Sequence, residues 1–220
     1  MCIRDSKYPV KYQKQGSYVG GLFVFESKLT QEFRLHFDEK IAEMFQSIGI
    51  REGSVWIEVF HDGENYYFNE VGFRYGGSVS IYPVDYFYQI NQVAADIHYA
   101  LTGESCISEH TSLIRSTLPR KKYYCIYPVH INAGTISSIS GLDKIAQLEN
   151  IVYLATTKYL HDRIESSGSF SQVFALVHFV CNTTEECIQT IDRIHQMLVV
   201  FDEHGNNMVN RMLDVGKIIF

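Results

Sequence analysis

The first half of the chain alternates between strand-like and helix-like spacing of apolar residues. Residues 20–26 form a short apolar run, which predicts a strand. Between residues 33 and 48 apolar side chains return every three or four positions. This spacing predicts a helix with one apolar face, and Gly49 follows where a helix stop is expected. A second stripe over residues 84–101, closed by Gly103, predicts one further helix.

The second half shows the same alternation, with stronger apolar runs. Residues 171–181 are almost entirely apolar, which predicts a buried strand. Thr183 followed by Glu186 has the spacing of a capping box and predicts the start of a helix. The apolar stripe of that helix consists of Cys187, Ile191, Ile194 and Leu198. Three shorter elements are predicted, a strand at residues 123–131, a helix at 142–148 and a strand at 152–155. Strands and helices therefore alternate, which favours an α+β or α/β class.

Composition and charge exclude several functional classes. The 220 residues are 46% hydrophobic and 20% charged, which is typical of globular proteins. The net charge is −6, and no basic stripe stands out apart from Arg120-Lys121-Lys122, so binding to nucleic acid or to a membrane surface is not expected. No apolar run has the length of a membrane span, and no signal peptide is visible. The five cysteines include no CxxC pair, which indicates neither a disulfide framework nor a zinc site and predicts a cytoplasmic location.

Two runs rich in β-branched and aromatic residues, at 54–60 and 65–71, predict a β-hairpin. Glu58 lies in the middle of the first run among apolar neighbours, and Glu70 lies near the end of the second. A carboxylate in such a place needs a partner, because burying an unpaired charge is costly. Two acids on neighbouring strands form a hard oxygen site that suits Mg²⁺. Glu58 and Glu70 are therefore the candidate metal ligands.

This hypothesis carries a geometric condition, because cross-strand partners point to the same face of a hairpin. A two-residue turn at Asp62-Gly63 would pair Glu58 with Tyr67 and place Glu70 on the opposite face. A three-residue loop would pair Glu58 with Phe68 and leave both glutamates on one face. The metal hypothesis therefore predicts a loop of odd length.

The segment that follows the hairpin carries groups suited to phosphate. Arg74 comes four residues after Glu70, and a guanidinium holds a carboxylate or phosphate with two hydrogen bonds. Gly76 and Gly77 allow a ligand to approach the backbone closely, and with Ser78 they are the candidate nucleotide-binding residues. Together these groups indicate transfer of a phosphoryl group from a metal-bound nucleotide, in which the protein mainly positions groups and neutralises charge.

These residues carry a specific resemblance. Residues 48–58 and then 67–77 resemble the ATP-grasp pattern of a helix, a glutamate strand, a hairpin and Glu-x-Asn-x-Arg followed by glycines. The chain is similar to the C-terminal part of an ATP-grasp carboxylate–amine ligase of the amino-acid ligase and biotin-carboxylase-like branch. The resemblance is sharp over Glu58–Gly77 and looser over residues 134–136 and 183–208, which are similar to the C-terminal extension of that family.

The resemblance implies an α+β fold with two parts. Residues 7–105 would be the C-terminal half of an ATP-grasp domain, an antiparallel sheet with packed helices. Residues 106–220 would be a smaller α+β C-terminal domain, and the polar, irregular stretch at 104–119 supports a boundary between them. Residues 1–6 resemble a translated sequencing adapter and are expected to be a non-native leader. The chain is therefore expected to be a fragment that lacks the ATP-holding half.

The resemblance also implies an activity. ATP-grasp ligases use Mg-ATP to phosphorylate a carboxylate, and an amine then displaces phosphate from the acyl phosphate. The cofactors would be ATP and Mg²⁺, and the partners a small-molecule carboxylate and an amine. By match, Glu58 and Glu70 would bind Mg²⁺ and Arg74 would be catalytic, stabilising the transferring phosphoryl group. Gly76–Ser78 would belong to the nucleotide site. Gly72 stands where many members carry Asn, so one metal ligand is missing or supplied otherwise.

Two other interpretations stay open. In the first, the grasp site is degenerate and the chain is a non-catalytic ligand-binding or interaction module, an interpretation that Gly72 and the expected missing half favour. In the second, a metal-dependent hydrolase uses the same carboxylates. Hydrolase sites usually recruit His or further Asp ligands, and none is suitably placed in the sequence. The oligomeric state and the identity of the two substrates do not follow from the residues.

Overall fold

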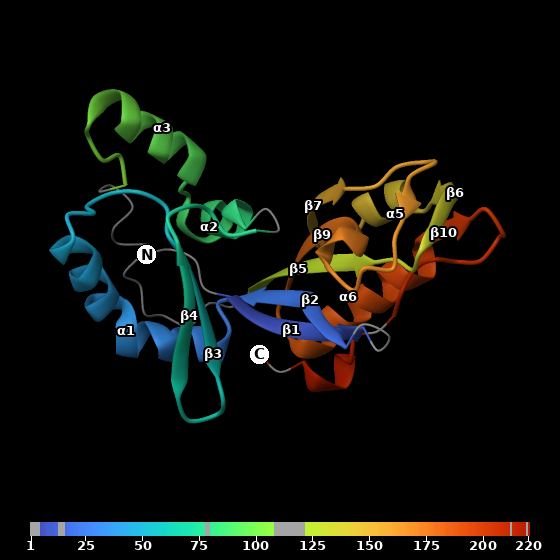
Figure 1. The fold of residues 1–220 in the computed structure, drawn as a ribbon, viewed down its shortest axis with the longest axis horizontal. Helices are drawn as coiled ribbons and strands as arrows, with labels where there is room; N and C mark the ends of the chain where they lie inside the picture. The colour runs from blue at the N-terminus through green and yellow to red at the C-terminus, as the bar shows by residue number, and fades with distance from the viewer. Residues whose placement is uncertain (1–4, 13–15, 78–79, 108–121, 212, 219) are drawn as a thin grey trace. The chain divides into compact units, whose positions relative to one another are not determined.

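The computed structural model describes residues 5–12, 16–77, 80–107, 122–211, 213–218 and 220 (Figure 1). These residues form two compact units. One comprises the described residues within 31–119, and the other comprises those within 5–30 and 120–220. The domain limits expected from the sequence, and the non-native origin of residues 1–6, stay predictions.

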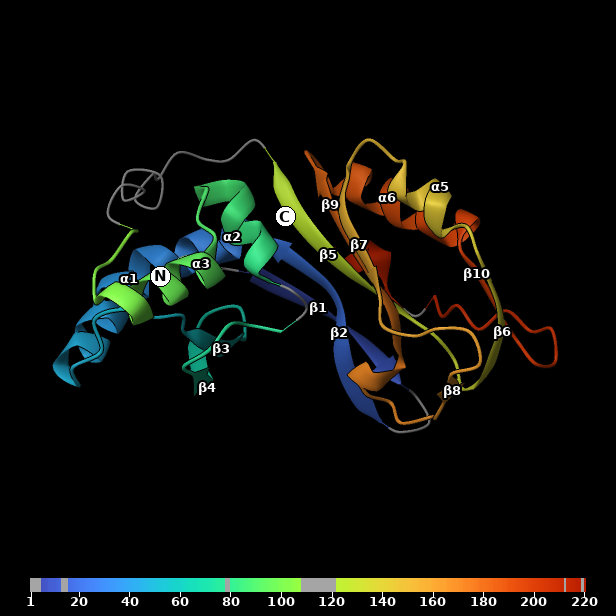
Figure 2. The ribbon, with the colours of Figure 1, turned by 90° about the horizontal axis from the view of Figure 1, so that it is seen from above.

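The second unit is built on a five-stranded antiparallel sheet with the order β1-β2-β5-β9-β7. Its strands are β1 (Asp5–Tyr12), β2 (Ser17–Phe25), β5 (Tyr123–His130), β9 (Val173–Cys181) and β7 (Ile151–Thr156). Helix α6 (Thr184–Met197) packs on β9, and α5 (Leu142–Ala146) packs on β7 and beside α6 (Figure 2). A smaller sheet has the order β10-β6-β8, and its strands are β10 (Val199–Asp202), β6 (Gly134–Ser140) and β8 (Arg163–Ile164). Short 3₁₀ turns also occur among the described residues, at η2 (Phe170–Gln172) and η3 (Val215–Lys217).

The core of the second unit confirms the apolar pattern of the sequence. Strand β9 is buried along nearly its whole length. Helix α6 begins where the capping signal predicts, because the Thr183 hydroxyl accepts a hydrogen bond from the Glu186 backbone N–H at 3.2 Å. The Glu186 carboxylate in turn accepts the Asn182 N–H at 2.7 Å. The predicted stripe of this helix is fully buried against the sheet, and its members are Cys187, Ile191, Ile194 and Leu198.

In the described part of the chain, the first unit combines a hairpin with three helices. Its elements are α1 (Lys28–Ser47), β3 (Trp56–His61), β4 (Tyr66–Gly72), α2 (Ile81–Tyr88) and α3 (Gln92–Thr102). Helix α1 lays an aromatic face on the hairpin. Phe37 lies 5.3 Å from Tyr66 and 5.4 Å from Phe68, measured between ring centroids. Phe33 makes similar contacts with both rings at 5.5 and 5.9 Å. Aromatic packing therefore decides which face of the hairpin is covered.

The single helix predicted over residues 84–101 is wrong, because the structure has two helices there. Gln89 adopts a left-handed conformation with φ of 56° and donates its N–H to Asp85, which ends α2. Asn91 then caps α3 by accepting the Ala94 N–H at 3.0 Å. The apolar stripe continues across this break, so periodicity alone did not reveal it. The last stripe position, Leu101, is 81% exposed.

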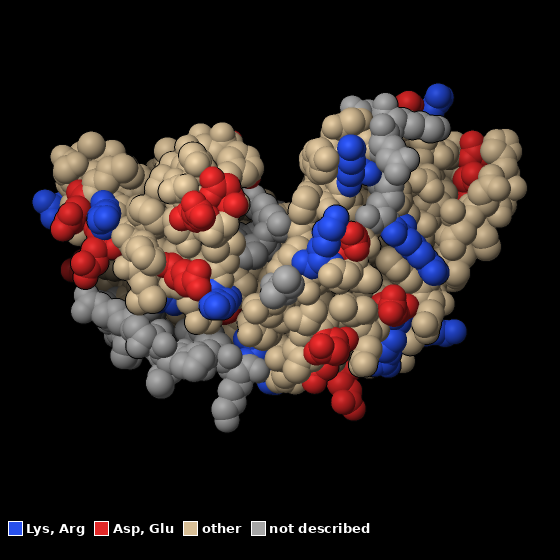
Figure 3. Space-filling model, turned by 90° about the horizontal axis from the view of Figure 1, so that it is seen from below, with Lys and Arg blue, Asp and Glu red and all other residues tan. Residues whose placement is uncertain are grey.

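The predicted class is confirmed as α+β with antiparallel sheets. Among the described residues, no helix is long and apolar enough to cross a membrane. Basic and acidic side chains are interspersed on the face of the molecule drawn in Figure 3.

Candidate functional site

The hairpin β3–β4 brings the two candidate metal ligands directly opposite each other. Glu58 is the cross-strand partner of Glu70, so both side chains point to the same face. The predicted route to this arrangement is wrong, however. His61 pairs with Tyr66, which leaves a loop of four residues rather than an odd number. A β-bulge between Glu58 and Val59 restores the shared face, because it shifts the register by one residue.

The bulge changes which residues of the hairpin lie on its apolar face and which lie on its carboxylate face. On one side of it, Val59 pairs with Phe68, whose ring packs against α1. On the other side, Glu58 pairs with Glu70. Without the bulge, the strict alternation of a strand would place Glu70 on the face of Phe68, which is the face that packs against α1. The extra residue, Asn69, therefore allows an apolar face and a carboxylate face to coexist in one short strand.

Asp62 explains why the loop has four residues. Its carboxylate accepts the backbone N–H groups of Glu64 at 3.0 Å and Asn65 at 2.8 Å, and it also accepts the Tyr67 hydroxyl at 2.9 Å. Gly63 supplies the positive φ, at +107°, that the turn requires. The hydrogen bond from the Asn65 N–H, followed by the one from the Glu64 N–H, lowers the pKa of Asp62 to about 2. A local side-chain network therefore determines the loop length.

The Trp56 ring lies beside Arg74 and Gly76, two of the residues predicted to bind phosphate. It lies two residues before Glu58 and so shares the face of Glu58 and Glu70. The Arg74 guanidinium stacks over the Trp56 ring at 4.9 Å and donates to the Tyr75 carbonyl at 2.9 Å. The structure therefore brings Glu58, Glu70 and Arg74 to one face of the hairpin. Sequence reasoning missed the role of Trp56, although it is the one tryptophan in the chain.

The glycines after the hairpin have different surroundings. A Cβ added at Gly76 would lie 3.1 Å from the Trp56 ring and 2.7 Å from the Ser80 hydroxyl, so these two side chains occupy the space beside this glycine. At Gly77 nothing lies within 4 Å of an added Cβ. Ser78 lies outside the described residues. At Gly72 an added Cβ would make ordinary contacts with Arg74 and Trp56, the nearest at 3.5 Å.

A hydrogen-bond network on α3 anchors the Arg74–Gly77 segment. The Asp96 carboxylate accepts the Tyr75 hydroxyl at 2.6 Å and the Ser54 hydroxyl at 3.0 Å. Burial, followed by the hydrogen bond to Asp96, raises the pKa of Tyr75 to about 12. Tyr75 thus stays a neutral donor, and it fixes the residues on either side of it. No motif in the sequence pointed to this network.

The electrostatic setting of the two glutamates differs from the expectation. Glu58 was expected to be a buried charge, but its side chain is half-buried and that of Glu70 is exposed. The Asn69 amide donates to Glu58 Oε2 at 2.9 Å, so the bulge residue holds one of the two carboxylates. The carboxylate face is therefore open to solvent, which suits a site that exchanges a soluble ligand.

This fold is found in part of several solved enzyme structures, including the following three. The L-amino acid ligase from Bacillus licheniformis matches with a TM-score of 0.70 and 19% sequence identity, over 91% of this chain and 52% of the enzyme. Phosphoribosylglycinamide synthetase from Anaerococcus prevotii matches with a TM-score of 0.70 and 13% identity, over 91% and 49%. The biotin carboxylase domain of Hydrogenobacter thermophilus 2-oxoglutarate carboxylase, determined with MgADP and bicarbonate, matches at 0.59 and 14%, over 88% and 45%. This chain has the fold of part of an ATP-grasp enzyme.

The ATP-grasp likeness is one of fold. No protein-family model and no curated protein matches the sequence. The chain spans about half the length of the structures that it matches. The predicted resemblance is therefore confirmed as an ATP-grasp-like fold shared with carboxylate–amine ligases and carboxylases. The roles of Glu58, Glu70, Arg74 and Gly76–Ser78 stay predictions.

Proposed function

We propose that this chain is the metal- and phosphate-binding C-terminal part of an ATP-grasp ligase that joins a carboxylate to an amine. In the proposed reaction the γ-phosphoryl group of ATP passes to the carboxylate, giving an acyl phosphate and ADP. The amine then attacks the acyl carbon, so that a carbon–nitrogen bond forms while the bond to phosphate breaks. The observation that carries the proposal is the pairing of Glu58 with Glu70, with Arg74 on the same face.

The donor set fits Mg²⁺. Directly opposed residues of an antiparallel pair have Cβ atoms about 4.5–5.5 Å apart, so both carboxylates reach one ion at Mg–O distances of about 2.0–2.1 Å. Mg²⁺ takes one or two carboxylates and leaves positions for phosphate oxygens, and when bound it would neutralise phosphate charge. Asn69, through its hydrogen bond to Glu58, is the proposed positioning residue of this carboxylate.

Arg74 is the proposed catalytic residue. Its side chain is exposed, and Trp56 supports its guanidinium from one side. A guanidinium held in this way is accessible to a phosphoryl oxygen and stabilises the charge that builds up there. Gly77, where nothing lies within 4 Å of an added Cβ, would let the phosphates approach the backbone.

The test uses the longest reading frame that contains this chain, with phosphate release from ATP measured in the presence of Mg²⁺ and amino acids. Glu70→Gln should lower kcat by about 10²–10³-fold, as expected when a group that stabilises transition-state charge is removed. Glu64→Gln, in the hairpin loop, makes the same charge change away from the pair and should leave the rate unchanged. If Glu70→Gln does not change the rate of phosphate release, Glu70 is not a catalytic metal ligand. No phosphate release from the unaltered protein supports the non-catalytic module.

Gly72 offers a second test of the same site. An asparagine fits there, because its Cβ would make only ordinary contacts. On the paired strands Gly72 lies opposite Trp56 and two residues from Glu70, so the new amide would join the carboxylate face. Gly72→Asn should therefore tighten Mg²⁺ binding, measured as a lower Mg²⁺ concentration at half-maximal rate. Gly72→Ala is the matched control, because it adds the Cβ without the amide ligand.

A further inference from the structure

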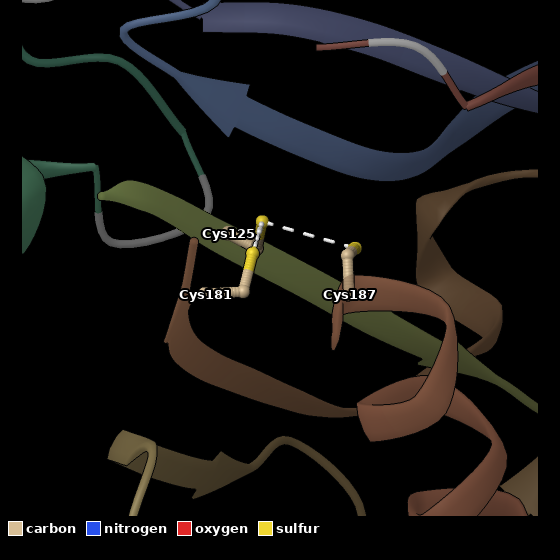
Figure 4. A group of neighbouring side chains, drawn as sticks. All are labelled: Cys125, Cys181 and Cys187. Atoms are coloured by element: carbon tan, nitrogen blue, oxygen red, sulfur yellow. Dashed lines mark hydrogen bonds between the residues drawn. The ribbon is translucent and has the colours of Figure 1, made fainter. Parts of the chain in front are cut away.

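The second unit contains a cluster of three buried cysteines far from one another in the sequence. Cys125 lies on β5, Cys181 ends β9 and Cys187 lies in the first turn of α6 (Figure 4). The Cys125 sulfur lies 3.7 Å from that of Cys181 and 4.0 Å from that of Cys187. All three sulfurs lie within 4.8 Å of one another. Each side chain is at most 2% exposed. The cysteine spacing in the sequence indicates no zinc site and gives no sign of this cluster.

The fold places the three side chains by simple rules. Cys125 is paired with Phe179, so Cys181, two residues further along β9, lies on the same face of the sheet. The chain then turns through Asn182 and the cap residue Thr183, and α6 returns over that face. Cys187 therefore projects from the helix onto the two strand cysteines. The cluster is part of the packed core rather than of a surface loop.

The sulfur spacing matches metal coordination. A metal ion with metal–sulfur bonds of about 2.3 Å requires its sulfurs about 3.8 Å apart in a tetrahedral site and about 4.0 Å apart in a trigonal one. The two sulfur–sulfur distances of 3.7 and 4.0 Å fall at these values. Soft thiolate donors select soft or borderline ions such as Zn²⁺ and Cu⁺. Since net charge is costly in an apolar core, a divalent ion leaves less negative charge on three thiolates than a monovalent one.

The strand register argues against a disulfide between Cys125 and Cys181. The cross-strand partner of Cys181 is Tyr123, and that of Cys125 is Phe179, so the two cysteines are diagonal neighbours. Diagonal positions on an antiparallel pair are about 7–8 Å apart at Cα, which is beyond the usual span of a disulfide. Bridging Cys125 to Cys181 would require the central strands of the sheet to move.

We propose that Cys125, Cys181 and Cys187 form a buried structural site for a divalent thiophilic metal ion, Zn²⁺ or an ion of the same class. The ion binds as the unit folds, because the sulfurs are closed off from solvent afterwards. Coordination converts the three thiols to thiolates and releases their protons to solvent. No electrons are exchanged. The site is independent of the carboxylate face of the hairpin and does not rest on the proposed ligase activity.

The test uses the full 220-residue chain with Cys2 and Cys106 replaced by serine. Cys2 lies outside the described residues and Cys106 is exposed, so this background keeps only the three cluster thiols. The protein is refolded with Cd²⁺ under reducing conditions and passed through a desalting column. We expect one Cd²⁺ retained per chain, the ultraviolet charge-transfer absorption of thiolate-bound Cd²⁺, and a higher Tm than that of the metal-free protein. Zn²⁺ added during refolding should prevent this absorption.

Cys187→Ala tests the geometry within the same background. It removes the helix ligand, so Cd²⁺ retention and the charge-transfer absorption should be lost while the far-ultraviolet circular dichroism keeps its folded shape. A folded Cys187→Ala protein that retains Cd²⁺ overturns the proposal. If Cys187→Ala does not fold, the protein that keeps all three cluster cysteines still tests the proposal. When that protein folds but retains no Cd²⁺ and shows no increase in Tm, the proposal is overturned.

Discussion

Glu58 and Glu70 lie opposite each other on the hairpin. We predict that, in the absence of Mg²⁺, the chain is more stable when one of these glutamates is replaced. Glu58 and Glu70 are direct cross-strand partners, and like charges in that position are destabilising. Glu70→Gln removes the repulsion and preserves the shape of the side chain. In the absence of divalent ions, we therefore expect Glu70→Gln to increase the free energy of unfolding of the first unit.

The spacing sets the magnitude of this effect. With carboxylates about 5 Å apart, two unit charges repel by about 0.8 kcal/mol at the dielectric constant of water and about 3 kcal/mol at an effective value of about 20. Glu58 is half-buried and Glu70 is exposed, so a gain of about 1 kcal/mol is expected. Binding of Mg²⁺ at ten times its Kd would stabilise the unaltered chain by about 1.4 kcal/mol. Mg²⁺ should therefore cancel or reverse the advantage of the variant.

Trp56 supplies the assay. It is the only tryptophan in the chain, and it lies on the same hairpin face as the two glutamates. Denaturant unfolding followed by Trp56 fluorescence therefore reports on the site itself. The free energy of unfolding is compared for the unaltered chain, Glu70→Gln and Glu64→Gln, each with and without Mg²⁺. The loop variant makes the same charge change and should follow the unaltered chain.

Two results would contradict this reasoning. If Mg²⁺ stabilised Glu70→Gln as much as the unaltered chain, Glu70 would not be a ligand. If Glu70→Gln lowered the free energy of unfolding without Mg²⁺, the two carboxylates would not repel each other in the folded state. Loss of the ion-dependent difference at high salt alone would show only screening, so the comparison is made at low, constant ionic strength.

Three further predictions follow from the packing. Gly76→Ala should lower the free energy of unfolding by about 1–3 kcal/mol and weaken the Trp56 fluorescence change on unfolding, because the added Cβ is crowded by Trp56 and Ser80. Gly77→Ala should have little effect, because nothing lies near its added Cβ. Equal losses in the two variants would contradict the crowding at Gly76. Burial lowers the pKa of His130 and of His195, so these histidines bind protons more readily in the unfolded chain. The second unit should therefore have its full stability above about pH 6.5 and lose stability below that pH. A denaturation midpoint that does not change with pH would refute this. Thr183→Ala should cost about 1 kcal/mol by removing the cap of α6, whereas Thr183→Ser should cost little, as measured by denaturant unfolding.

Much of the fold followed from local patterns. The strand at β9, the stripe of α6 and its Thr183 cap were predicted because burial on two faces, a helical period and a capping box each leave a mark within about ten residues. The break between α2 and α3 was missed for a physical reason. Gln89 in the left-handed region carries no composition signal, and the apolar stripe runs on across it.

The cysteine cluster and the Tyr75–Asp96 anchor were also outside the reach of the sequence. Cys125 and Cys187 are separated by 62 positions, and only the return of α6 over the sheet makes them neighbours. Asp96 receives hydrogen bonds from Ser54 and Tyr75, which come from segments before and after the hairpin. Long-range pairs of this kind depend on tertiary packing, because no local propensity specifies them.

The hairpin shows most clearly which features the sequence determined and which the tertiary structure determined. The sequence by itself determined that two strands carry Glu58 and Glu70 and that Arg74 and the glycines follow, because alternation and turn residues are local. It did not determine that the glutamates share a face. The Asp62 network selects a loop of even length, and a one-residue bulge compensates for it. The tertiary structure decided this point, since the bulge lets Phe68 pack on α1 and turns Glu70 away from that apolar contact toward Glu58.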